Sequence, residues 1–151
     1  MEKLSGISAG VSGEYFVAAE LSRRGYISSV TLKNTKGIDI LVSNENGSKL
    51  IGIQVKTNQG SRKAWVLSAK AEDVREDLLI YVLVNLNGLG VPDYYIVSSK
   101  TVADEIKSGH SAWLNTPGKK GQKHNDNNMR LFGDLNDTHK EKWDVIEAAL
   151  T

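Results

Sequence analysis

The chain contains no cysteine and only three histidines. Without cysteine, neither a disulfide framework nor a thiolate zinc site can form. The histidines, His110, His124 and His139, are too far apart in the sequence for a compact helical metal motif. Histidines dispersed in this way are usually surface or capping residues, so we expect no three-histidine zinc site.

Long hydrophobic runs are also missing. The longest strongly apolar run, residues 78–84, is far shorter than the roughly 20 residues that cross a bilayer. The first residues, MEKLSGISAG, lack the apolar block of a signal peptide. With 151 residues, 40% hydrophobic and 25% charged, the composition is that of one globular domain. We therefore expect a single cytoplasmic domain, residues 1–151, with no membrane association.

The net charge is only +1, but its distribution is uneven. Residues 1–70 hold 10 basic and 5 acidic side chains, whereas residues 71–151 hold 9 and 13. This asymmetry permits a positively charged face on a nearly neutral molecule, and chance variation in composition explains it equally well.

The first half of the chain predicts a helix and several strands. Residues 12–24, SGEYFVAAELSRR, have apolar residues at helical spacing, with Ser12 as a candidate cap and Gly25 past the end. A short strand, YISSVTL, follows. Residues 38–43 and 49–57 then form an antiparallel hairpin, because Asn-Gly between them is a strong turn signal.

The second half predicts further strands and helices. The segments AWVLS, LLIYVLVNL and DYYIVSS read as strands, the second of them buried on both faces, with the short acidic helix AEDVREDL before it. We expect helices at residues 99–107, ending before Gly109, and 137–150, with a loop at 115–130 between them. This order predicts an α/β (α+β) domain around a mixed sheet flanked by helices.

Three polar residues converge at one end of the predicted hairpin. In the second strand, Gln54 and Lys56 share the face opposite Ile53 and Val55. Because the turn is short, Asp39 at the start of the first strand lies close to the end of the second. Taken singly, each side chain has an ordinary explanation as a turn cap, a solvated strand residue or a strand-end cation.

Together, these residues resemble the PD-(D/E)XK nuclease superfamily, whose core motif is an Asp followed across a hairpin by Glu or Gln, any residue, and Lys. SGEYFVAAELSRRGY is similar to the opening helix of archaeal Holliday junction resolvases, in the spacing between Glu14 and Gly25. The resemblance covers residues 12–57 well and the order of elements loosely to about residue 96. It implies a restriction endonuclease-like three-layer core and a DNA endonuclease that hydrolyses phosphodiester bonds.

The resemblance also implies a catalytic set of Glu14, Asp39, Gln54 and Lys56 and a bound Mg²⁺ or Mn²⁺. Glu14, Asp39, the Gln54 amide oxygen and the Val55 backbone carbonyl would be its ligands, since magnesium takes oxygen ligands and few carboxylates. The ion would relieve negative charge on the phosphoryl group, and Lys56 would orient the attacking water or stabilise developing charge.

The chain departs from the superfamily pattern at two positions. Gln54 stands where Glu is more usual, which removes a negative charge and predicts weaker metal binding. Ile38 replaces the proline that precedes the motif Asp. The alternative hypothesis is therefore a catalytically inactive module of the same fold that binds a protein or nucleic-acid partner.

Basic residues near the proposed site and in the late loop are candidate phosphate contacts, which supply salt-dependent affinity without sequence readout. These DNA-binding candidates are Lys36, Arg62, Lys63, Lys119, Lys120 and Lys123. As ordinary surface residues they need no such role. The resemblance also implies a homodimer, in which two sites act on two strands.

Overall fold

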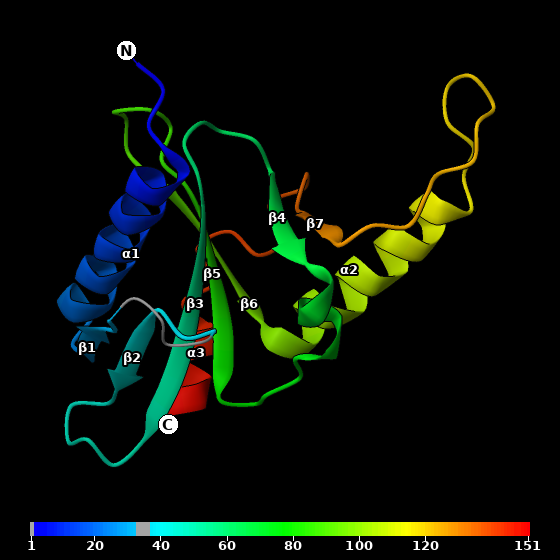
Figure 1. The fold of residues 1–151 in the computed structure, drawn as a ribbon. Helices are drawn as coiled ribbons and strands as arrows, with labels where there is room; N and C mark the ends of the chain where they lie inside the picture. Colours follow the sequence, from blue (N-terminus) through cyan, green and yellow to red (C-terminus); the bar gives the residue numbers. More distant parts are fainter. Residues whose placement is uncertain (1, 33–36) are drawn as a thin grey trace.

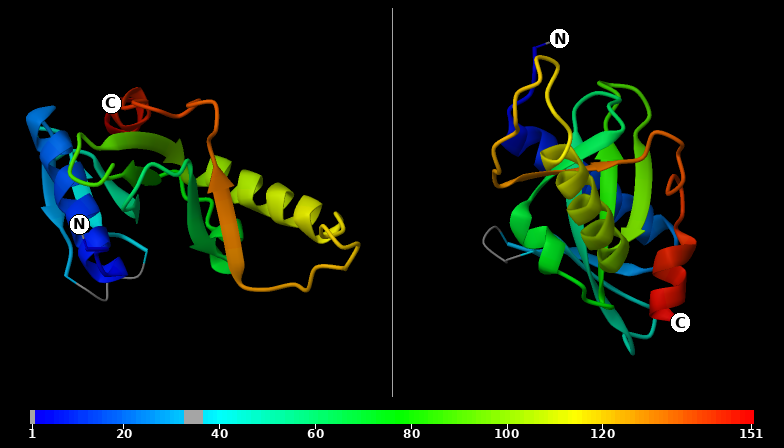
Figure 2. Two further views of the ribbon diagram at one scale, coloured as in Figure 1. Left: turned by 90° about the horizontal axis from the view of Figure 1, so that it is seen from above. Right: turned by 90° about the vertical axis from the view of Figure 1, so that its right-hand side faces the viewer.

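A computed structural model of the chain describes residues 2–32 and 37–151. Its elements are α1 (Gly6–Arg23), β1 (Ile27–Val30), β2 (Ile40–Ser43), β3 (Leu50–Asn58), β4 (Ala64–Ser68), the 3-10 helix η1 (Ala69–Asp73), β5 (Leu79–Asn85), β6 (Asp93–Ser98), α2 (Ser99–Leu114), β7 (Met129–Gly133) and α3 (Asp144–Leu150). Figures 1 and 2 show their arrangement.

The main sheet has five strands in the order β1-β2-β3-β5-β6. Only β3 and β5 pair in parallel; the other neighbours are antiparallel. The segment between β3 and β5 contains β4, which pairs with β7 in a separate two-stranded sheet. The predicted mixed sheet is therefore confirmed, and the central position of β5 follows from its seven buried residues.

Helices cover both faces of the main sheet, so the fold has three layers (Figure 2). On one face, α1 and α3 pack against Ile53, Val55 and Val82 through Val17 and Ile146. On the other face, α2 and the β4–β7 sheet form a second core, which contains Trp65, Tyr81, Tyr95, Val102 and Phe132. The three-layer architecture expected from the sequence is confirmed.

The predicted hairpin is present as β2 and β3, with Ser43 opposite Leu50 and Ile40 opposite Ile53. The turn uses Gly47 with a φ of 71°, a conformation that glycine adopts without steric cost. Asn46 contributes through its side chain, whose Oδ1 accepts from Ser48 N. The Asn-Gly signal thus identified the turn, although only the glycine has a positive φ.

The N-terminal helix begins earlier than predicted. Ser5, not Ser12, is its cap and accepts a hydrogen bond from Ser8 N, while Ser12 lies inside the helix and donates to Ser8 O. The additional turns bring Ala9 into the core, where it is 6% exposed. The predicted end is correct, since Gly25 follows it with a φ of 91°.

The prediction of a helix at residues 99–107 is wrong at its C-terminal end. Ser98 caps α2, which begins at Ser99 as predicted, but the helix continues through Gly109 to Leu114. Gly109 does not adopt the positive φ of a helix-ending glycine. Trp113 stacks on His110 and His124 at 5.5 Å and 4.1 Å between ring centroids, which holds the last turn of the helix.

The C-terminal region also differs from the prediction. A helix over residues 137–150 is wrong, because Asp137 and Glu141 have φ values of 55° and 56° and α3 begins only at Asp144. The predicted loop over residues 115–130 is wrong at its end, where β7 begins at Met129. The acidic helix predicted after β4 is only the short η1.

The last part of α2, from Gly109, and residues 115–128 extend beyond the body of the molecule (Figure 1). We refer to this segment as the arm. It carries Lys119, Lys120 and Lys123, which are all exposed. Separately, no helix within the described ranges 2–32 and 37–151 is long and apolar enough to cross a membrane.

Asp137 connects the segment after β7 to the sheet, and we expect this connection to depend on pH. Its carboxylate accepts from Lys63 Nζ at 2.8 Å and from the Tyr95 hydroxyl at 2.9 Å. The hydrogen bond from Lys63 is the main cause that lowers the pKa of Asp137. The stabilisation is therefore complete above the unfolded-state pKa of about 3.9 and is lost as pH falls through the lower folded-state value.

Asp137→Asn should consequently unfold at lower denaturant concentration than the wild type at pH 7, with a smaller difference at pH 3. Asparagine tolerates the positive φ, so the backbone is preserved. Urea unfolding at the two pH values measures the effect, with exposed Asp77→Asn as the control. Equal differences at both pH values would contradict the role of the charge.

Candidate active site

The candidate site lies where β3 extends beyond its partner β2. The two strands pair as far as Ile40 and Ile53, and Asp39 N still donates to Ile53 O at 2.8 Å. From Gln54 onward, β3 pairs on that side with no strand of the described residues. Instead, Asp39 Oδ2 accepts from Val55 N at 2.7 Å, so a carboxylate oxygen takes the place of the backbone acceptor that a neighbouring strand would supply. Asp39 is thereby fixed at the open edge.

The same edge presents a backbone carbonyl beside Asp39. In a strand, the N–H and C=O of one residue point toward the same neighbour. Val55 N points toward Asp39, so Val55 C=O also lies on this edge. The prediction that Val55 contributes a backbone carbonyl at this position is consistent with the strand geometry.

Gln54 and Lys56 lie on one face of β3, as the alternation predicted. The pairing of β3 with β5 places Gln54 opposite Tyr81, whereas Asp39 is joined to the same stretch of β3 by its hydrogen bonds with Ile53 O and Val55 N. Neither Gln54 nor Lys56 forms a side-chain hydrogen bond or ion pair with any residue in the described ranges. Both polar groups therefore remain available to a ligand.

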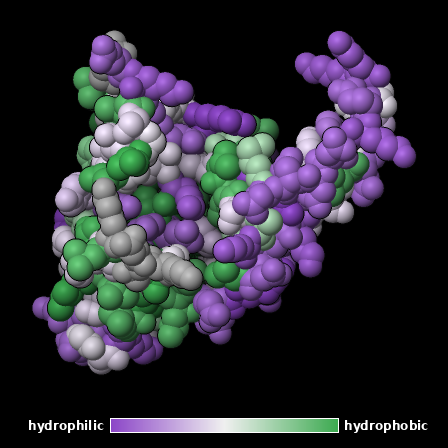
Figure 3. Space-filling model, viewed as in Figure 1, coloured by the Kyte–Doolittle hydropathy of each residue, from purple (hydrophilic) through white to green (hydrophobic). Residues whose placement is uncertain are grey.

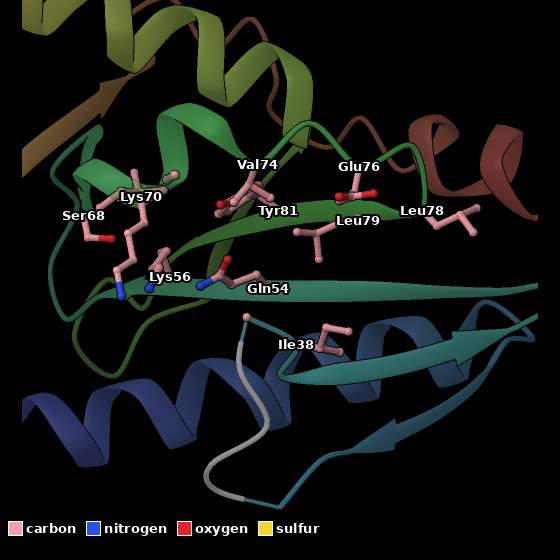
Figure 4. A pocket seen from close by; sticks show the side chains of 13 residues that line it. Ile38, Gln54, Lys56, Ser68, Lys70, Val74, Glu76, Leu78, Leu79 and Tyr81 are labelled. Carbon is pink, nitrogen blue, oxygen red and sulfur yellow. The ribbon is translucent and has the colours of Figure 1, made fainter.

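A cavity of about 690 Å³ covers Gln54 and Lys56. Figure 4 shows it between β3, β5 and η1, and Figure 3 shows a hollow between the α1 side and the α2 side of the molecule. Most of its wall is apolar, from Ile38 on one side and Val74 and Leu79 on the other. Neither Glu14 nor Asp39 lines this cavity; Asp39 lies directly beside Ile38, which does.

The far side of the cavity contains residues that the sequence did not single out. Lys70 comes from η1 and Tyr81 from β5, and both line the cavity with Gln54 and Lys56. In Figure 4 the side chain of Lys70 extends from η1 toward β3. Burial raises the pKa of Tyr81 above its ordinary value. A tyrosine within the otherwise apolar strand LIYVLVN was the available signal for this residue.

Glu14 comes from α1, which covers the opposite face of the sheet. The preceding residue, Gly13, is buried against Thr57: a Cβ added to Gly13 would lie 1.9 Å from Thr57 Oγ1. This close approach places the backbone of α1 against Thr57, in the part of β3 that extends beyond its pairing with β2. Glu14 itself is partly buried.

The oxygen donors at the candidate site suit a hard cation, although the protein supplies few of them. Carboxylate, amide and backbone carbonyl oxygens are the ligands that Mg²⁺ accepts, and it retains several waters when protein ligands are few. Across the part of the chain that the structure describes, no three His, Cys, Asp or Glu residues form a metal-binding group. A cation here would therefore depend on Gln54 and Val55 as well as on acidic residues.

The candidate DNA-binding residues are not gathered at one place. Lys63 pairs with Asp137, and Arg62 is exposed in the loop before β4. Lys119, Lys120 and Lys123 lie on the arm (Figure 1). Lys36 lies outside the described residues.

The layers and the sheet order agree with the expected restriction endonuclease-like fold. Among solved structures, the chain is similar to the bacterial homing endonuclease I-Ssp6803I, at 14% identity and a TM-score of 0.54, over 95% of this chain and 93% of that one. It is also similar to the Holliday junction resolvase Hjc of Archaeoglobus fulgidus, at 13% identity and a TM-score of 0.48, over 83% and 84%. No protein-family model and no curated protein matches the chain.

Proposed function

We propose that the chain is a metal-dependent DNA endonuclease. The observation that carries the proposal is that Gln54 and Lys56 lie on one face of β3 while Asp39 is hydrogen-bonded to Val55 between them, at an edge where β3 has no partner among the described strands. These polar side chains line or adjoin a cavity instead of packing in a core. A solved structure that shares this fold is that of a bacterial homing endonuclease, which supports the proposal.

Each residue has a distinct role in the proposed reaction. Asp39, Gln54, the Val55 carbonyl and Glu14 would hold Mg²⁺ or Mn²⁺, which supplies charge neutralisation and lowers the pKa of a bound water. Val55 N–H holds one oxygen of Asp39, so the carboxylate is oriented before any ligand binds. Lys56 places an unpaired ammonium group beside them, where it stabilises negative charge on the phosphoryl oxygens or leaving group.

Lys56→Met tests the proposed charge stabilisation. Methionine keeps an unbranched, apolar stem of similar length, so packing is preserved while the ammonium group is lost. We expect cleavage of supercoiled DNA in Mg²⁺ or Mn²⁺ to fall roughly 10²- to 10³-fold, with thermal unfolding unchanged. Gel assays of single-turnover cleavage measure the change.

The matched control is Lys100→Met, which removes an exposed lysine at the start of α2. It should cut at the wild-type rate. Wild-type cleavage by Lys56→Met would refute the role of Lys56, and no cleavage by the wild type on supercoiled, branched or single-stranded DNA with either metal would refute the proposed activity.

The second candidate is a noncatalytic module of the same fold that binds a protein or nucleic-acid partner. The amide at Gln54 favours it, because a neutral side chain replaces a carboxylate in the donor set. This candidate requires that no divalent cation binds near Asp39. Calorimetric titration with Mn²⁺ separates the two, since heat that is present in wild type and lost in Asp39→Asn rules out the noncatalytic form.

The arm gives the proposed enzyme a second contact with DNA. Lys119, Lys120 and Lys123 are exposed on a segment whose surface is largely hydrophilic (Figure 3). As phosphate contacts they would contribute salt-dependent affinity without base recognition. A homodimer would place two such sites on two strands, and sedimentation of the free protein measures the oligomeric state.

A further inference from the structure

The cavity beside Lys56 has more apolar wall than a phosphate-binding groove requires. Contacts to the DNA backbone are made by charged and polar groups. Here the walls are formed mainly by Ile38, Leu67, Ala71, Val74 and Leu79. The volume of about 690 Å³ lies within the range of roughly 300–1,000 Å³ that holds small organic ligands. A duplex that passed over this site would leave the cavity empty.

Six polar residues line this cavity: Gln54, Lys56, Ser68, Lys70, Glu76 and Tyr81. Lys56 and Lys70 enter from opposite walls, from β3 and from η1 (Figure 4). Tyr81 and Gln54 are neighbours on β5 and β3. The Tyr81 side chain is buried, but its hydroxyl forms no hydrogen bond with any residue in the described ranges and is not among the buried unsatisfied oxygens. The hydroxyl is therefore reached from the cavity and can hydrogen-bond to a ligand there.

We propose that the cavity binds an unstacked nucleotide of a DNA strand, with the base against the apolar wall and the phosphate between Lys56 and Lys70. A base in an intact duplex is paired and stacked, so it cannot enter without unpairing. An unstacked base offers apolar faces to Val74 and Leu79, and polar edges to Tyr81 and Gln54. This inference rests on the proposed function and assigns its substrate class: DNA with unpaired bases, such as a fork or a flap.

The charge arrangement favours a nucleotide over the side chain of a protein partner. Both cations that line the cavity, Lys56 and Lys70, lack an ion-pair partner among the residues the structure describes, and Glu76, the acidic residue that also lines it, lies toward the other end (Figure 4). A ligand that combines an apolar planar group with a nearby negative charge fits this combination. A second copy of the chain that inserted an apolar side chain would leave both cations unpaired.

The decisive measurement is binding in the presence of EDTA, which does not require cleavage. Fluorescence anisotropy compares a forked oligonucleotide with a fully paired duplex of the same sequence. We expect the fork to bind roughly 10- to 100-fold more tightly, because the duplex must first unpair a base. Equal binding of fork and duplex, or no binding of either, would overturn the proposal.

Val74→Trp and Val66→Trp form a matched pair of variants. Val74 lines the cavity, whereas Val66 is 50% exposed on β4 and lines none of it. Filling the cavity should reduce the preference for the fork to within about twofold, while Val66→Trp keeps the full preference. If Val74→Trp retains the preference, the cavity does not hold the base. If Val74→Trp instead dissociates a wild-type dimer in sedimentation, a second copy fills the cavity and the proposal fails.

A measurement on the wild-type protein covers the case in which Val74→Trp does not fold. The fluorescent base 2-aminopurine, placed at the unpaired position of the fork, should become shielded from acrylamide quenching when the protein binds. Unchanged quenching would show a solvated base and overturn the proposal. Binding preference without cleavage would refute the proposed enzyme and leave this inference intact, whereas cleavage without preference would refute this inference alone.

Discussion

Asp39→Asn is expected to fold normally and to lose cleavage by roughly 10³-fold. The asparagine Oδ1 can still accept from Val55 N–H, so the bond that closes the unpaired edge of β3 is kept. The charge at the proposed metal site is lost, and an amide is a much weaker ligand than a carboxylate. Single-turnover cleavage, together with Mn²⁺ calorimetry, measures both effects.

Asp39→Ala separates the structural role from the catalytic role. Alanine removes the acceptor as well as the charge and leaves Val55 N–H unpaired in a residue that is 8% exposed. This should lower the free energy of unfolding by about 1–3 kcal/mol. The asparagine variant should be close to wild type in urea unfolding. An asparagine variant that cuts at the wild-type rate would remove Asp39 from the site.

The main sheet was predictable because its signals are local. Alternation of Ile51, Ile53 and Val55 with polar residues gives the faces of β3, and the apolar run before Asn85 gives the central strand. The same alternation placed Gln54 and Lys56 together. The short turn then brought Asp39 to them, and the hydrogen bond to Val55 shows how close it lies.

The boundaries that failed depend on contacts between distant segments. No residue type near Glu141 in the sequence indicates that it adopts a positive φ. That backbone conformation interrupts the helix predicted there. β7 was not predicted because one of its inward-facing residues is Arg130, which is buried and forms an ion pair with Glu72. Alternation of apolar and polar residues cannot reveal a strand whose inward-facing residue is charged.

The cavity could not be predicted from the hairpin, although Gln54 and Lys56, which line it, were predicted as site residues. Its far wall comes from η1 and from the start of β5, which reach the site only because β3 and β5 pair in parallel. Lys70 therefore had no visible connection to Lys56 in the sequence. The tyrosine in β5 was visible, but its orientation toward Gln54 depends on the register between the two strands.

Gly13→Ala is expected to destabilise the fold and to reduce cleavage, because it changes the distance between α1 and β3. The new Cβ would lie 1.9 Å from Thr57 Oγ1 and 2.9 Å from Thr57 Cβ, so the helix or the strand must move. Overpacking of this kind costs about 1–3 kcal/mol. The shift would also move Glu14, the next residue, away from the proposed site, so cleavage should fall in folded protein as well.

Gly10→Ala is the matched control, since it lies in the same helix with no atom within 4 Å of the added Cβ. Higher helix propensity should make it more stable by roughly 0.5–1 kcal/mol, with unchanged cleavage. The double variant Gly13→Ala/Thr57→Ala should recover part of the lost stability, because it removes the Thr57 hydroxyl that clashes with the new Cβ. This hydroxyl is also the one buried side-chain oxygen without a hydrogen-bond partner within the described ranges. If Gly13→Ala lowers stability while the folded fraction cuts at the wild-type rate, the packing of α1 is structural and Glu14 is not part of the site.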